Sequence, residues 1–433
     1  MKHSVWIDTI KLPQFETLQG DKKTDVLIIG GGICGILTAY LLKQSGIDCI
    51  VVEGNRLASG MTKNTTAKIT SQHGLIYTKL QESYGKDYAK KYLYANQLAL
   101  QEYERLSQII DCDFEKRDAF TYSTTDRELI ENEVQTVQGL GFPAEFIETV
   151  PLPFSTKGAI RFPNQAQFHP LKFIRELVKD LTIFENTFIK DITPSKAISA
   201  SGSVTANKMI VATHFPFINK HGSFFLKLYQ HRSYVLALEH APHIDGMYVD
   251  ADKKGMSFRS YDKLLLLGGG GHRTGKHGGT WTELYSFQKE HYPNAKPVYE
   301  WSAQDCMSLD GVPYIGLYSP KTPNLYVASG FNKWGMTSSM AAAQILTDMI
   351  KEKPNPYADI FSPARSIWKP QLLVNSLESA LHLLTPSTKR CPHLGCSLKW
   401  NSAEHSWDCP CHGSRFEEDG KLIDNPATGD ATI

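Results

Sequence analysis

The sequence predicts an α/β fold: a domain of parallel strands and helices, an accompanying α+β domain, and a small all-β lobe at the C-terminal end. Three observations lead to this prediction. A β-branched apolar run near the start of the chain opens into a glycine-rich turn and a helical pattern. Short strand patterns dominate the middle of the chain. Two loops rich in Cys and His lie close to its end.

The composition is that of a globular enzyme. With 433 residues the chain is long enough for two or three domains, and its hydrophobic content of 41% and charged content of 21% are ordinary. The net charge of +1 gives no reason to expect nucleic acid or an anionic membrane as a partner. No apolar run approaches the roughly 18 residues of a membrane span, and the first residues lack the apolar core of a signal peptide. We therefore expect a cytoplasmic protein that contacts neither nucleic acid nor membrane.

The first strand, helix and second strand follow one another directly. Residues Thr24–Ile29 form an apolar run typical of a buried parallel strand. They lead into Gly30–Gly35, which matches G-x-G-x-x-G, and the apolar positions after it recur at helical spacing. Asp48–Val52 is the second expected strand, and it ends at Glu53. Strand, turn, helix, strand and acidic residue in this order predict a dinucleotide site. A glycine-rich turn that binds nothing is the alternative.

Each residue of this motif has its own expected role. Gly30 makes the tight turn, Gly32 lets the backbone approach a pyrophosphate, and Gly35 lets the helix pack closely on the strand. The N–H groups at the start of the helix face the phosphates. Glu53 is placed to accept hydrogen bonds from ribose hydroxyls.

Two long helices are expected farther along. Lys79–Ile110 is expected to be one amphipathic helix, and its stripe of tyrosines and leucines is more typical of core packing than of cofactor contact. Ile367–Leu384 is expected to be another, with Pro370 as the point where it could kink. The other expected elements are a strand at 120–123, helices at Glu128–Val137 and Phe168–Leu181, and strands at Phe188–Ile192, Lys208–Thr213, Tyr234–Glu239, Gly246–Val249, Met256–Ser260 and Lys263–Gly268.

The C-terminal loops carry the most specific pattern in the chain. Cys391 and His393 stand on the first loop, and Cys409 and His412 follow after a gap of fifteen residues. One Cys and one His on each of two loops suits a Rieske [2Fe–2S] centre, in which two His replace two Cys on one iron. The two thiolates would hold the buried iron and the two imidazoles the outer one. A chain with such a centre is expected to be a redox protein.

Two alternatives to this centre remain open. Two Cys and two His also suit zinc, but zinc would leave the second pair, Cys396 and Cys411, and the nearby Ser414 without a role. A lobe that has lost its cluster is the other alternative. Flavin and iron–sulfur absorption in the purified protein would decide between them.

The N-terminal motif and a later segment resemble a known family. Gly30–Gly35, Glu53 and Ser59–Ser71 resemble the FAD-binding segment of the D-amino-acid oxidase/glycine oxidase superfamily. Leu325–Thr337 resembles its late strand, glycine-rich loop and helix, whose N–H groups face the flavin ring. The resemblance implies a Rossmann-like FAD-binding domain of the D-amino-acid oxidase type. The residues that it implies for cofactor binding are Gly30, Gly32, Gly35, Glu53, Thr65, Thr66, Phe188, Gly330, Gly335 and Met336.

Together with the C-terminal loops, the chain resembles FAD-dependent oxidoreductases that carry a Rieske tail. In Rieske proteins of the respiratory-complex type, a Cys pair placed like Cys396 and Cys411 forms a disulfide. Asn425–Ala427 resembles the proline-containing loop that covers the cluster. The strands that usually precede the first ligand loop are mostly missing here. We therefore expect this truncated lobe either to dock on the FAD-binding domain or to depend on its cluster and disulfide for folding.

The resemblance also divides the chain into domains. The expected FAD-binding domain comprises residues 21–80, 161–213 and 305–355, the substrate domain 81–160 and 214–304, the helical linker 356–384, and the Rieske lobe 385–433.

The function implied by the resemblance is oxidation of a small amine or amino acid. FAD would take a hydride from a carbon next to nitrogen, and the cluster would pass electrons singly to or from a partner protein. The candidate catalytic residues are Arg259, Tyr261 and His73, and the weaker candidates are Arg232, Arg273 and Lys333. An electron-transfer protein that works with a redox partner instead of an amine is the alternative. Thiazole or tRNA-modification chemistry on the same flavin fold is a third hypothesis, which the neutral charge disfavours.

Overall fold

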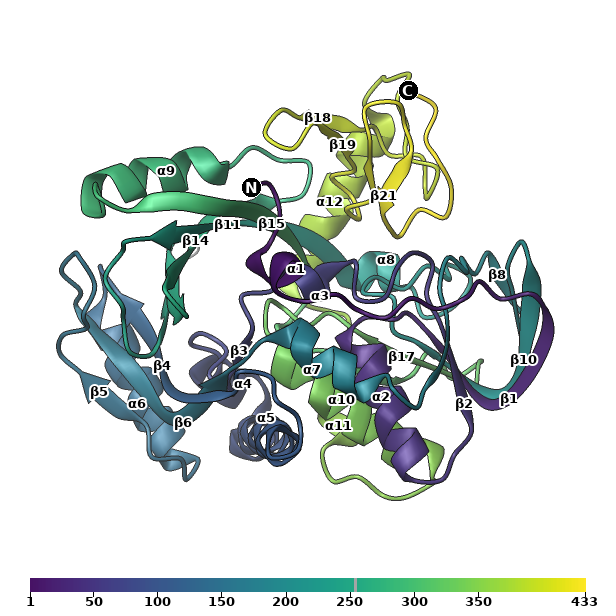
Figure 1. The fold of residues 1–433 in the computed structure, drawn as a ribbon, viewed down its shortest axis with the longest axis horizontal. Coiled ribbons are helices and arrows are strands. Elements are labelled where there is room, and N and C mark those ends of the chain that lie inside the picture. The colour runs from purple at the N-terminus through teal and green to yellow at the C-terminus, as the bar shows by residue number, and fades with distance from the viewer. Residues whose placement is uncertain (253–254) are drawn as a thin grey trace.

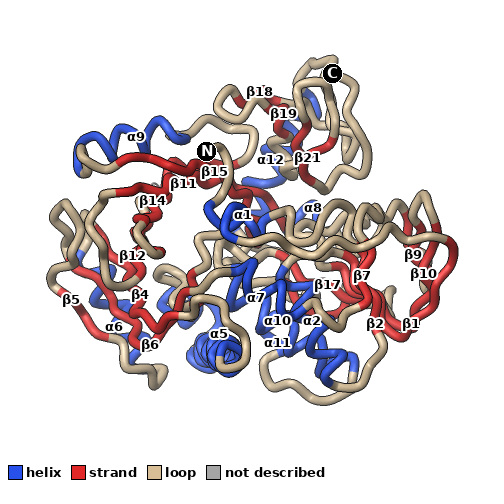
Figure 2. Tube along the Cα trace, in the orientation of Figure 1, coloured by secondary structure: helices blue, strands red, loops and turns tan. Residues whose placement is uncertain are grey.

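Two large sheets and a small lobe make up the fold (Figure 1). The computed structural model describes residues 1–252 and 255–433. A group of helices lies between the two sheets, and the lobe formed by the end of the chain stands at the top of the view (Figure 2). Among the described residues, no helix is both long enough and apolar enough to cross a bilayer. The observed layers confirm the predicted α/β fold with a small C-terminal β lobe.

The first sheet carries the glycine-rich turn. Its order is β16-β17-β10-β1-β2-β7, and β1 pairs in parallel with both β10 and β2. The strand expected at Thr24–Ile29 is the buried half of a longer strand, and the strand expected at Asp48–Val52 is confirmed as β2. The strands of this sheet are β1 (Gly20–Ile29), β2 (Cys49–Val52), β7 (Thr182–Phe184), β8 (Asp191–Ile192), β9 (Lys196–Ile198), β10 (Gly202–Val211), β16 (Tyr314–Leu317) and β17 (Leu325–Ser329).

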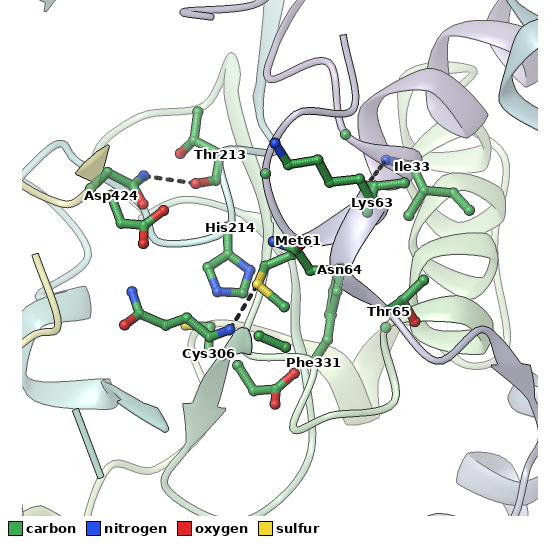
Figure 3. Close-up of a pocket in the computed structure, with 18 of the residues that line it drawn as sticks. Ile33, Met61, Lys63, Asn64, Thr65, Thr213, His214, Cys306, Phe331 and Asp424 are labelled. Atoms are coloured by element: carbon green, nitrogen blue, oxygen red, sulfur yellow. Dashed lines mark hydrogen bonds between the residues drawn. The ribbon is translucent and has the colours of Figure 1, made fainter. Parts of the chain in front are cut away.

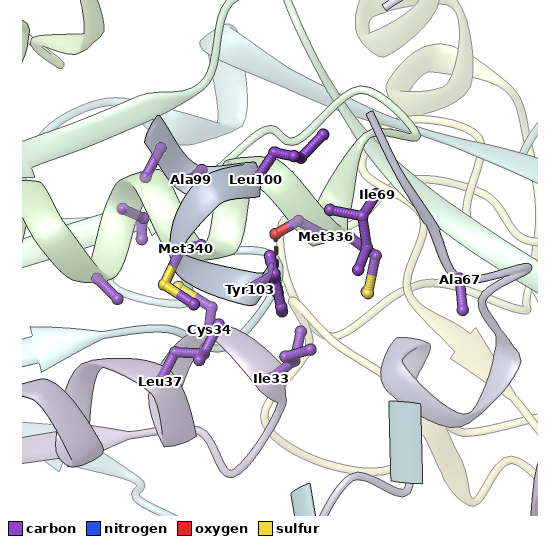
Figure 4. Packing of buried hydrophobic residues seen from close by; sticks show 14 of the residues in the cluster. Ile33, Cys34, Leu37, Ala67, Ile69, Ala99, Leu100, Tyr103, Met336 and Met340 are labelled. Carbon is purple, nitrogen blue, oxygen red and sulfur yellow. Dashed lines mark hydrogen bonds between the residues drawn. The ribbon is translucent and has the colours of Figure 1, made fainter. Parts of the chain in front are cut away.

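Three helices stack in the layer beside this sheet. The helix α2 (Ile33–Gln44) packs on α10 (Gly335–Ile350), which packs in turn on α5 (Lys86–Ser107). Figure 4 shows their contact: the hydroxyl of Tyr103 donates to the backbone oxygen of Met336 at 3.0 Å, among buried aliphatic side chains. The tyrosines of the long helix therefore serve the core, as the sequence suggested, and α5 lies beside the helices of the first sheet.

Two expected helices differ in detail from the observed ones. The helix expected at Lys79–Ile110 is divided into α4 (Tyr77–Tyr84) and α5 because Gly85 adopts a φ of 90°, which breaks the helical path. The helix expected from Ile367 begins instead at Pro370, as α12 (Pro370–Leu384), and has no kink. Proline is well tolerated in the first helical turn, where its missing N–H has no helical partner. The remaining helices are α1 (Val5–Thr9), α3 (Met61–Asn64), α6 (Arg127–Gly139), α7 (Pro170–Leu177), α8 (Phe224–Lys227), α9 (Thr280–His291) and α11 (Ala358–Phe361).

The second sheet has the order β15-β11-β14-β13-β12-β4-β6-β3, with β5 paired to β6. Most neighbours are antiparallel, and the expected boundary between residues 160 and 161 falls inside β6, a continuous strand of this sheet. Its strands are β3 (Lys68–Ile69), β4 (Glu115–Ser123), β5 (Glu145–Ile147), β6 (Gly158–Gln167), β11 (Leu228–Glu239), β12 (Met247–Asp250), β13 (Ser257–Tyr261), β14 (Leu264–Arg273) and β15 (Lys296–Ser308).

The C-terminal lobe is a four-stranded antiparallel sheet docked on the rest of the protein. Its strands are β18 (Lys399–Asn401), β19 (Ser406–Asp408), β20 (Arg415–Phe416) and β21 (Leu422–Asp424). The amide of Gln230 on β11 donates to the backbone oxygen of His412 at 2.9 Å, and Gln304 on β15 donates to that of Gly413 at 2.9 Å. Of the two ways in which the truncated lobe could be supported, docking is therefore observed.

Candidate functional site

A cavity of about 1070 Å³ extends from the glycine-rich turn to the C-terminal lobe (Figure 3). At one end it is lined by Gly30, Gly32 and Glu53. At the other end its wall is the lobe segment 421–425 together with residues 427–430. One continuous space is thus walled by both domains and by the lobe.

The glycines at the first end leave room for the backbone and for a ligand. A Cβ on Gly35 would lie 2.0 Å from the backbone oxygen of Gly30, and a Cβ on Gly30, which has a φ of 117°, would lie 2.5 Å from the oxygen of Ala212. These two glycines therefore allow close packing of turn, helix and strand. A Cβ on Gly32 would meet only the hydroxyl oxygen of Thr62, at 3.4 Å, so the space before Gly32 opens into the cavity.

Glu53 is held in place at the end of β2. Its carboxylate accepts hydrogen bonds from the backbone N–H groups of Gly31 at 2.7 Å and of Asn55 at 2.8 Å. Burial raises the pKa of Glu53, and these backbone donors oppose the shift. The carboxylate, the opening at Gly32 and the start of α2 fit the dinucleotide that the motif predicts.

Most of the residues expected to bind this dinucleotide line the cavity. Those that do so are Gly30, Gly32, Glu53, Thr65, Thr66, Phe188, Gly335 and Met336. Gly35 and Gly330 lie outside the lining. Gly330 has a φ of 73°, and a Cβ there would lie 3.0 Å from Leu228. Their positions suit packing of the backbone behind the site.

Arg259 and Tyr261, two of the candidate catalytic residues, lie outside the cavity lining. Arg259 is only 1% exposed, and its guanidinium donates to the backbone oxygens of Thr66 at 2.6 Å and Ala67 at 2.8 Å. The hydroxyl of Tyr261 donates to Asp113 at 2.9 Å. Arg259 thus supports the segment that lines the cavity instead of reaching into the cavity itself. Both residues stand on β13, and the spacing in the sequence does not show which face of a strand points to a cavity.

His73 lines the cavity, but both of its ring nitrogens are engaged. Its Nδ1 lies 2.6 Å from the hydroxyl of Tyr92, its Nε2 lies 2.9 Å from the backbone oxygen of Thr70, and its ring stacks on Trp334 at 5.0 Å between centroids. Burial lowers the pKa of His73 to about 3. Because the imidazole is neutral and both of its nitrogens have hydrogen-bond partners, it is suited to holding Trp334 in position and not to accepting a proton from a substrate.

Lys333 and Asp305 bring opposite charges to the same cavity, beside His214. Asn332 and Lys333 have φ values of 51° and 73°, a left-handed turn that non-glycine residues rarely adopt and that is typical of functional sites. Burial lowers the pKa of Lys333, whereas Asp305 opposes that shift, and burial raises the pKa of Asp305, whereas Lys333 and His214 oppose it. The hydroxyl of Ser233 donates to Asp305 at 3.4 Å. The structure therefore presents an amine and a carboxyl group to a ligand.

The other two arginines considered from the sequence are already paired. Arg232 lines the cavity, but its guanidinium makes two contacts with the carboxylate of Glu404 in the lobe. Arg273 donates to Asn375 at 3.0 Å and lies over the ring of Tyr229 at 4.8 Å. Neither guanidinium is available for a substrate carboxylate in this arrangement.

The four ligand candidates of the C-terminal loops lie together. The rings of His393 and His412 have centroids 4.9 Å apart, and the Nδ1 atoms of both are buried without a hydrogen-bond partner among the described residues. Cys391 and Cys409 are buried free thiols, and the hydrogen bond between them lowers the pKa of Cys391 and raises that of Cys409. Two thiols and two unpartnered imidazole nitrogens fit the expected [2Fe–2S] ligand set.

Features around these loops also match the sequence-based expectations. A disulfide joins Cys396 to Cys411 and so links the two ligand loops. The hydroxyl oxygen of Ser414 accepts the backbone N–H of Ala427 at 3.0 Å, which holds the proline-containing loop against the ligand loops.

The segment 213–217 separates the cavity from the two imidazoles. Its residues Thr213, His214 and Phe217 line the cavity. Phe215, on the opposite side, lies edge-on to His393 and His412, with centroids 6.5 Å and 6.2 Å away. One short piece of chain is therefore shared by the two candidate cofactor sites.

The outer edges of the imidazoles are covered by the stretch that follows. The Nε2 of His393 lies 2.9 Å from the side-chain oxygen of Asn219, and the ring of Phe225 lies edge-on to that of His412, with centroids 6.3 Å apart. Asn425 in the lobe donates to the backbone oxygens of Thr213 at 2.7 Å and Phe215 at 2.8 Å.

A buried ion network fastens the lobe beside the cavity. Glu404 contacts Arg232 of β11 and also accepts from Arg415 at 2.9 Å. Arg415 lies 3.1 Å from Asp408 and 3.2 Å from Asp424. Burial raises the pKa of Glu404, but the two arginines outweigh it and lower that pKa to about 2. The carboxylate is therefore charged, and it links the lobe to the second sheet.

Sequence reasoning did not identify several of these residues. His214 directly follows the strand expected at Lys208–Thr213, Asp305 stands in a polar stretch that begins the third part of the expected FAD-binding domain, and Asn219 and Glu404 lie in loops without a motif. The position of His214 at the end of an expected strand was a signal, whereas Asp305 lies inside β15 and nothing in the sequence marked it. Lys68, whose pKa burial lowers to about 7, also lines the cavity; it lies in the segment Ser59–Ser71 that carries the family resemblance but was not singled out there.

Comparison with known proteins agrees with this site. Residues 25–349 match the family model of FAD dependent oxidoreductases, and residues 374–432 match that of the Rieske [2Fe-2S] domain. The Bacillus subtilis (strain 168) protein YhfW, named as a Rieske 2Fe-2S iron-sulfur protein, is 33% identical over 98% of this chain and 95% of its own length.

Two solved structures share the fold of the larger part of the chain. Glycine oxidase from Geobacillus kaustophilus superposes with a TM-score of 0.65 at 20% identity, covering 80% of this chain and 99% of its own. L-amino acid deaminase from Proteus vulgaris superposes with a TM-score of 0.66 at 15% identity, covering 82% of this chain and 100% of its own.

Proposed function

Because the chain belongs to the FAD dependent oxidoreductase family and also carries a Rieske [2Fe-2S] domain, we propose that it oxidises a small amine or amino acid and exchanges the electrons singly through its cluster with a partner protein. Bound FAD supplies the hydride acceptor and the [2Fe–2S] cluster supplies the one-electron carrier. The protein's own contribution is to bind the substrate, orient it and hold the two cofactor sites close together.

One observation carries this proposal: a single cavity reaches from the dinucleotide motif to the lobe, and the segment 213–217 both lines this cavity and contacts the imidazoles of His393 and His412. The lobe docks through Gln230, Gln304 and the Glu404 network, so this spacing is fixed by buried polar contacts. A detached lobe would have to find its electron donor by diffusion. The docked one supports transfer within the molecule.

Substrate recognition is assigned to the charged groups of the cavity. Lys333 is the candidate partner of a substrate carboxylate, and Asp305 that of an ammonium group, because both project into the cavity and neither forms an ion pair of 4 Å or less with a described residue. Arg259 and Tyr261 act at most behind the wall, and His73 positions Trp334. This assignment gives Lys333 the role for which Arg259, Arg232 and Arg273 were candidates from the sequence.

The function is tested by anaerobic mixing of the FAD-loaded, cluster-loaded protein with small amines, amino acids and hydroxy acids. We expect at least one amine or amino acid to bleach the flavin absorption, followed by the electron paramagnetic resonance signal of a reduced Rieske cluster. If none of these compounds reduces the flavin while a reduced ferredoxin does, the protein exchanges electrons with a carrier and the proposed amine oxidation is wrong. Flavin reduction without any cluster signal would refute the proposed route.

Replacing Lys333 tests the substrate assignment. A Lys333→Met variant is expected to raise the KM for an amino acid about 10- to 100-fold, because a charge-assisted hydrogen bond worth roughly 1.5–3 kcal/mol is lost. The KM for the matching amine without a carboxylate is expected to stay the same. Asp305→Asn should raise the KM for both compounds. Lys321→Met, which removes an exposed loop lysine, is the matched control. Equal effects of Lys333→Met on both compounds would contradict the assignment.

A further inference from the structure

The helix α12 turns an apolar face to solvent. Leu373, Leu377, Leu381 and Leu384 are 65%, 61%, 57% and 82% exposed, and their spacing places them along one side of the helix. The other large apolar side chains exposed in the same stretch are Trp368, Val374 and Leu383. Soluble helices normally bury such a face, so its exposure calls for a partner.

Polar contacts fix this orientation of the helix. Asn375 and His382 are the buried residues of α12. The side-chain oxygen of Asn375 accepts from Arg273 at 3.0 Å, and the backbone oxygen of His382 accepts the N–H of Ser397 at 2.9 Å. The helix is therefore held by its polar side, and rotation that would bury the leucines would break these contacts.

The residues that flank the stripe in the sequence are mostly basic. The stripe itself has no charged side chain, and the single acidic residue between positions 364 and 400, Glu378, is paired with Lys276 at 2.7 Å. Lys369 stands just before the helix, and Lys389 and Arg390 follow soon after it. Cations at both ends of an uncharged apolar stripe are complementary to an anionic surface.

The stripe continues to a loop of the lobe. Leu394, between the candidate ligand His393 and the disulfide-bonded Cys396, is 38% exposed. A Cβ on Gly395 would lie 4.0 Å from a side-chain carbon of Leu383, so the end of α12 contacts this loop. A surface that covers the stripe therefore also reaches the loop.

We propose that α12 is a peripheral membrane-binding helix that lies on an anionic lipid bilayer, with its leucines in the boundary between headgroups and acyl chains. Exposed leucines along one side of a helix, an exposed tryptophan just before it, and lysine and arginine near its ends are features of helices that bind in this way. Binding would hold the ligand loop at the bilayer surface, within reach of a lipid-soluble electron carrier. The sequence-based expectation of no membrane contact used the charge of the whole chain and the lack of a spanning run, and neither detects a local patch.

Two other occupants fit these observations less well. In a symmetric dimer through the stripe, Lys369 of each copy would face either Lys369 or the Lys389–Arg390 end of the other, so like charges would meet in both orientations. A specific protein partner is usually met by aromatic and arginine anchors with a polar rim, whereas this stripe is aliphatic and offers almost no hydrogen-bonding groups. A fluid bilayer binds an aliphatic stripe without aromatic anchors and without hydrogen-bonding groups.

Vesicle flotation of the cofactor-loaded protein tests the proposal. We expect it to float with vesicles of phosphatidylcholine and phosphatidylglycerol, to float much less with phosphatidylcholine alone, and to lose binding as salt is added. The variant Leu373→Ser/Leu377→Ser/Leu381→Ser should lower the bound fraction at least about tenfold, because it removes three apolar side chains that would enter the bilayer. The matched control is Leu98→Ser/Ile109→Ser/Leu129→Ser, which removes three exposed apolar residues elsewhere and should float as the unmodified protein does.

A charge reversal provides a second variant should the triple variant fail to fold, as judged by its flavin absorption. Lys369→Glu is expected to reduce the preference for anionic vesicles about threefold or more, since roughly 1 kcal/mol is lost for each lysine at such a surface. Absence of flotation with anionic vesicles, or equal flotation of the unmodified protein and the triple variant, would overturn the proposal. So would a dimer in sedimentation that the triple variant dissociates, since a second copy would then cover the stripe.

Discussion

A Glu404→Leu variant is expected to release the C-terminal lobe from the rest of the protein. The change leaves Arg232 and Arg415 buried without the carboxylate that both contact. Removing one partner of a buried ion pair costs about 3–5 kcal/mol, because the remaining charges lose their compensation in a poorly solvating environment. We expect a lower urea midpoint, faster proteolysis near residue 385 and slower reduction of the cluster by substrate.

A surface carboxylate provides the control for this variant. Glu418 is exposed in the same lobe, and Glu418→Leu is expected to change the free energy of unfolding by less than about 0.5 kcal/mol. If Glu404→Leu behaves like Glu418→Leu, the network does not hold the lobe and the docking must rest on Gln230 and Gln304.

The same contact has a defined pH dependence. The pKa of Glu404 is lowered from 4.5 to about 2 in the folded state, where Arg232 and Arg415 outweigh the effect of burial. A lowered pKa gives stability that is fully present above the unfolded value and is lost as the pH falls towards the folded value. We therefore expect the lobe to loosen between about pH 4.5 and 2, by about 3 kcal/mol in total. The Glu404→Leu variant should lack this component.

A Gly35→Ala variant is expected to destabilise the FAD-binding domain so strongly that the protein no longer binds FAD. The new methyl carbon would lie 2.0 Å from the backbone oxygen of Gly30 and 3.3 Å from Ile28, and neither can yield without moving β1 or α2. Because the obstacle is a backbone atom, we expect the free energy of unfolding to fall by about 4 kcal/mol or more, which is at the upper end for single substitutions. The measurements are the FAD content of the purified protein and its thermal unfolding.

Gly139 offers a matched control for this substitution. It is the last residue of α6, and a Cβ there would meet no atom within 4 Å. Gly139→Ala is expected to leave FAD content unchanged and to raise stability slightly, by about 0.5–1 kcal/mol, since alanine favours the helix. An FAD-replete, stable Gly35→Ala protein would show that the turn and helix can separate and would contradict the packing role of Gly35.

The local elements followed from the sequence where short-range patterns decide them. Thr24–Ile29, the glycine-rich turn and Asp48–Val52 form the predicted strand, turn and strand because buried parallel strands need continuous apolar runs and the turn needs residues without Cβ atoms. Lys79–Ile110 was predicted too long, because apolar periodicity continues through Gly85 while the backbone does not.

The site was predicted less completely, since it combines residues from distant parts of the chain. Arg259 and Tyr261 stand on a strand, where one residue of offset changes which face a side chain joins, and the sequence of β13 did not reveal that face. Lys333 and Asp305 come together only after β15 and the loop before α10 are assembled. Glu404 and Arg232 are 172 positions apart.

The amino-acid sequence by itself determined the chemistry of this protein: an FAD-binding motif and a Rieske ligand set, both now supported by the family matches. These could be identified because turns and ligand loops hold their key residues within a few positions of one another. Only the tertiary structure decided which charged groups face the cavity, how the truncated lobe is held and that α12 exposes its leucines. Those properties depend on burial and on contacts between residues far apart in the chain, which local patterns do not encode.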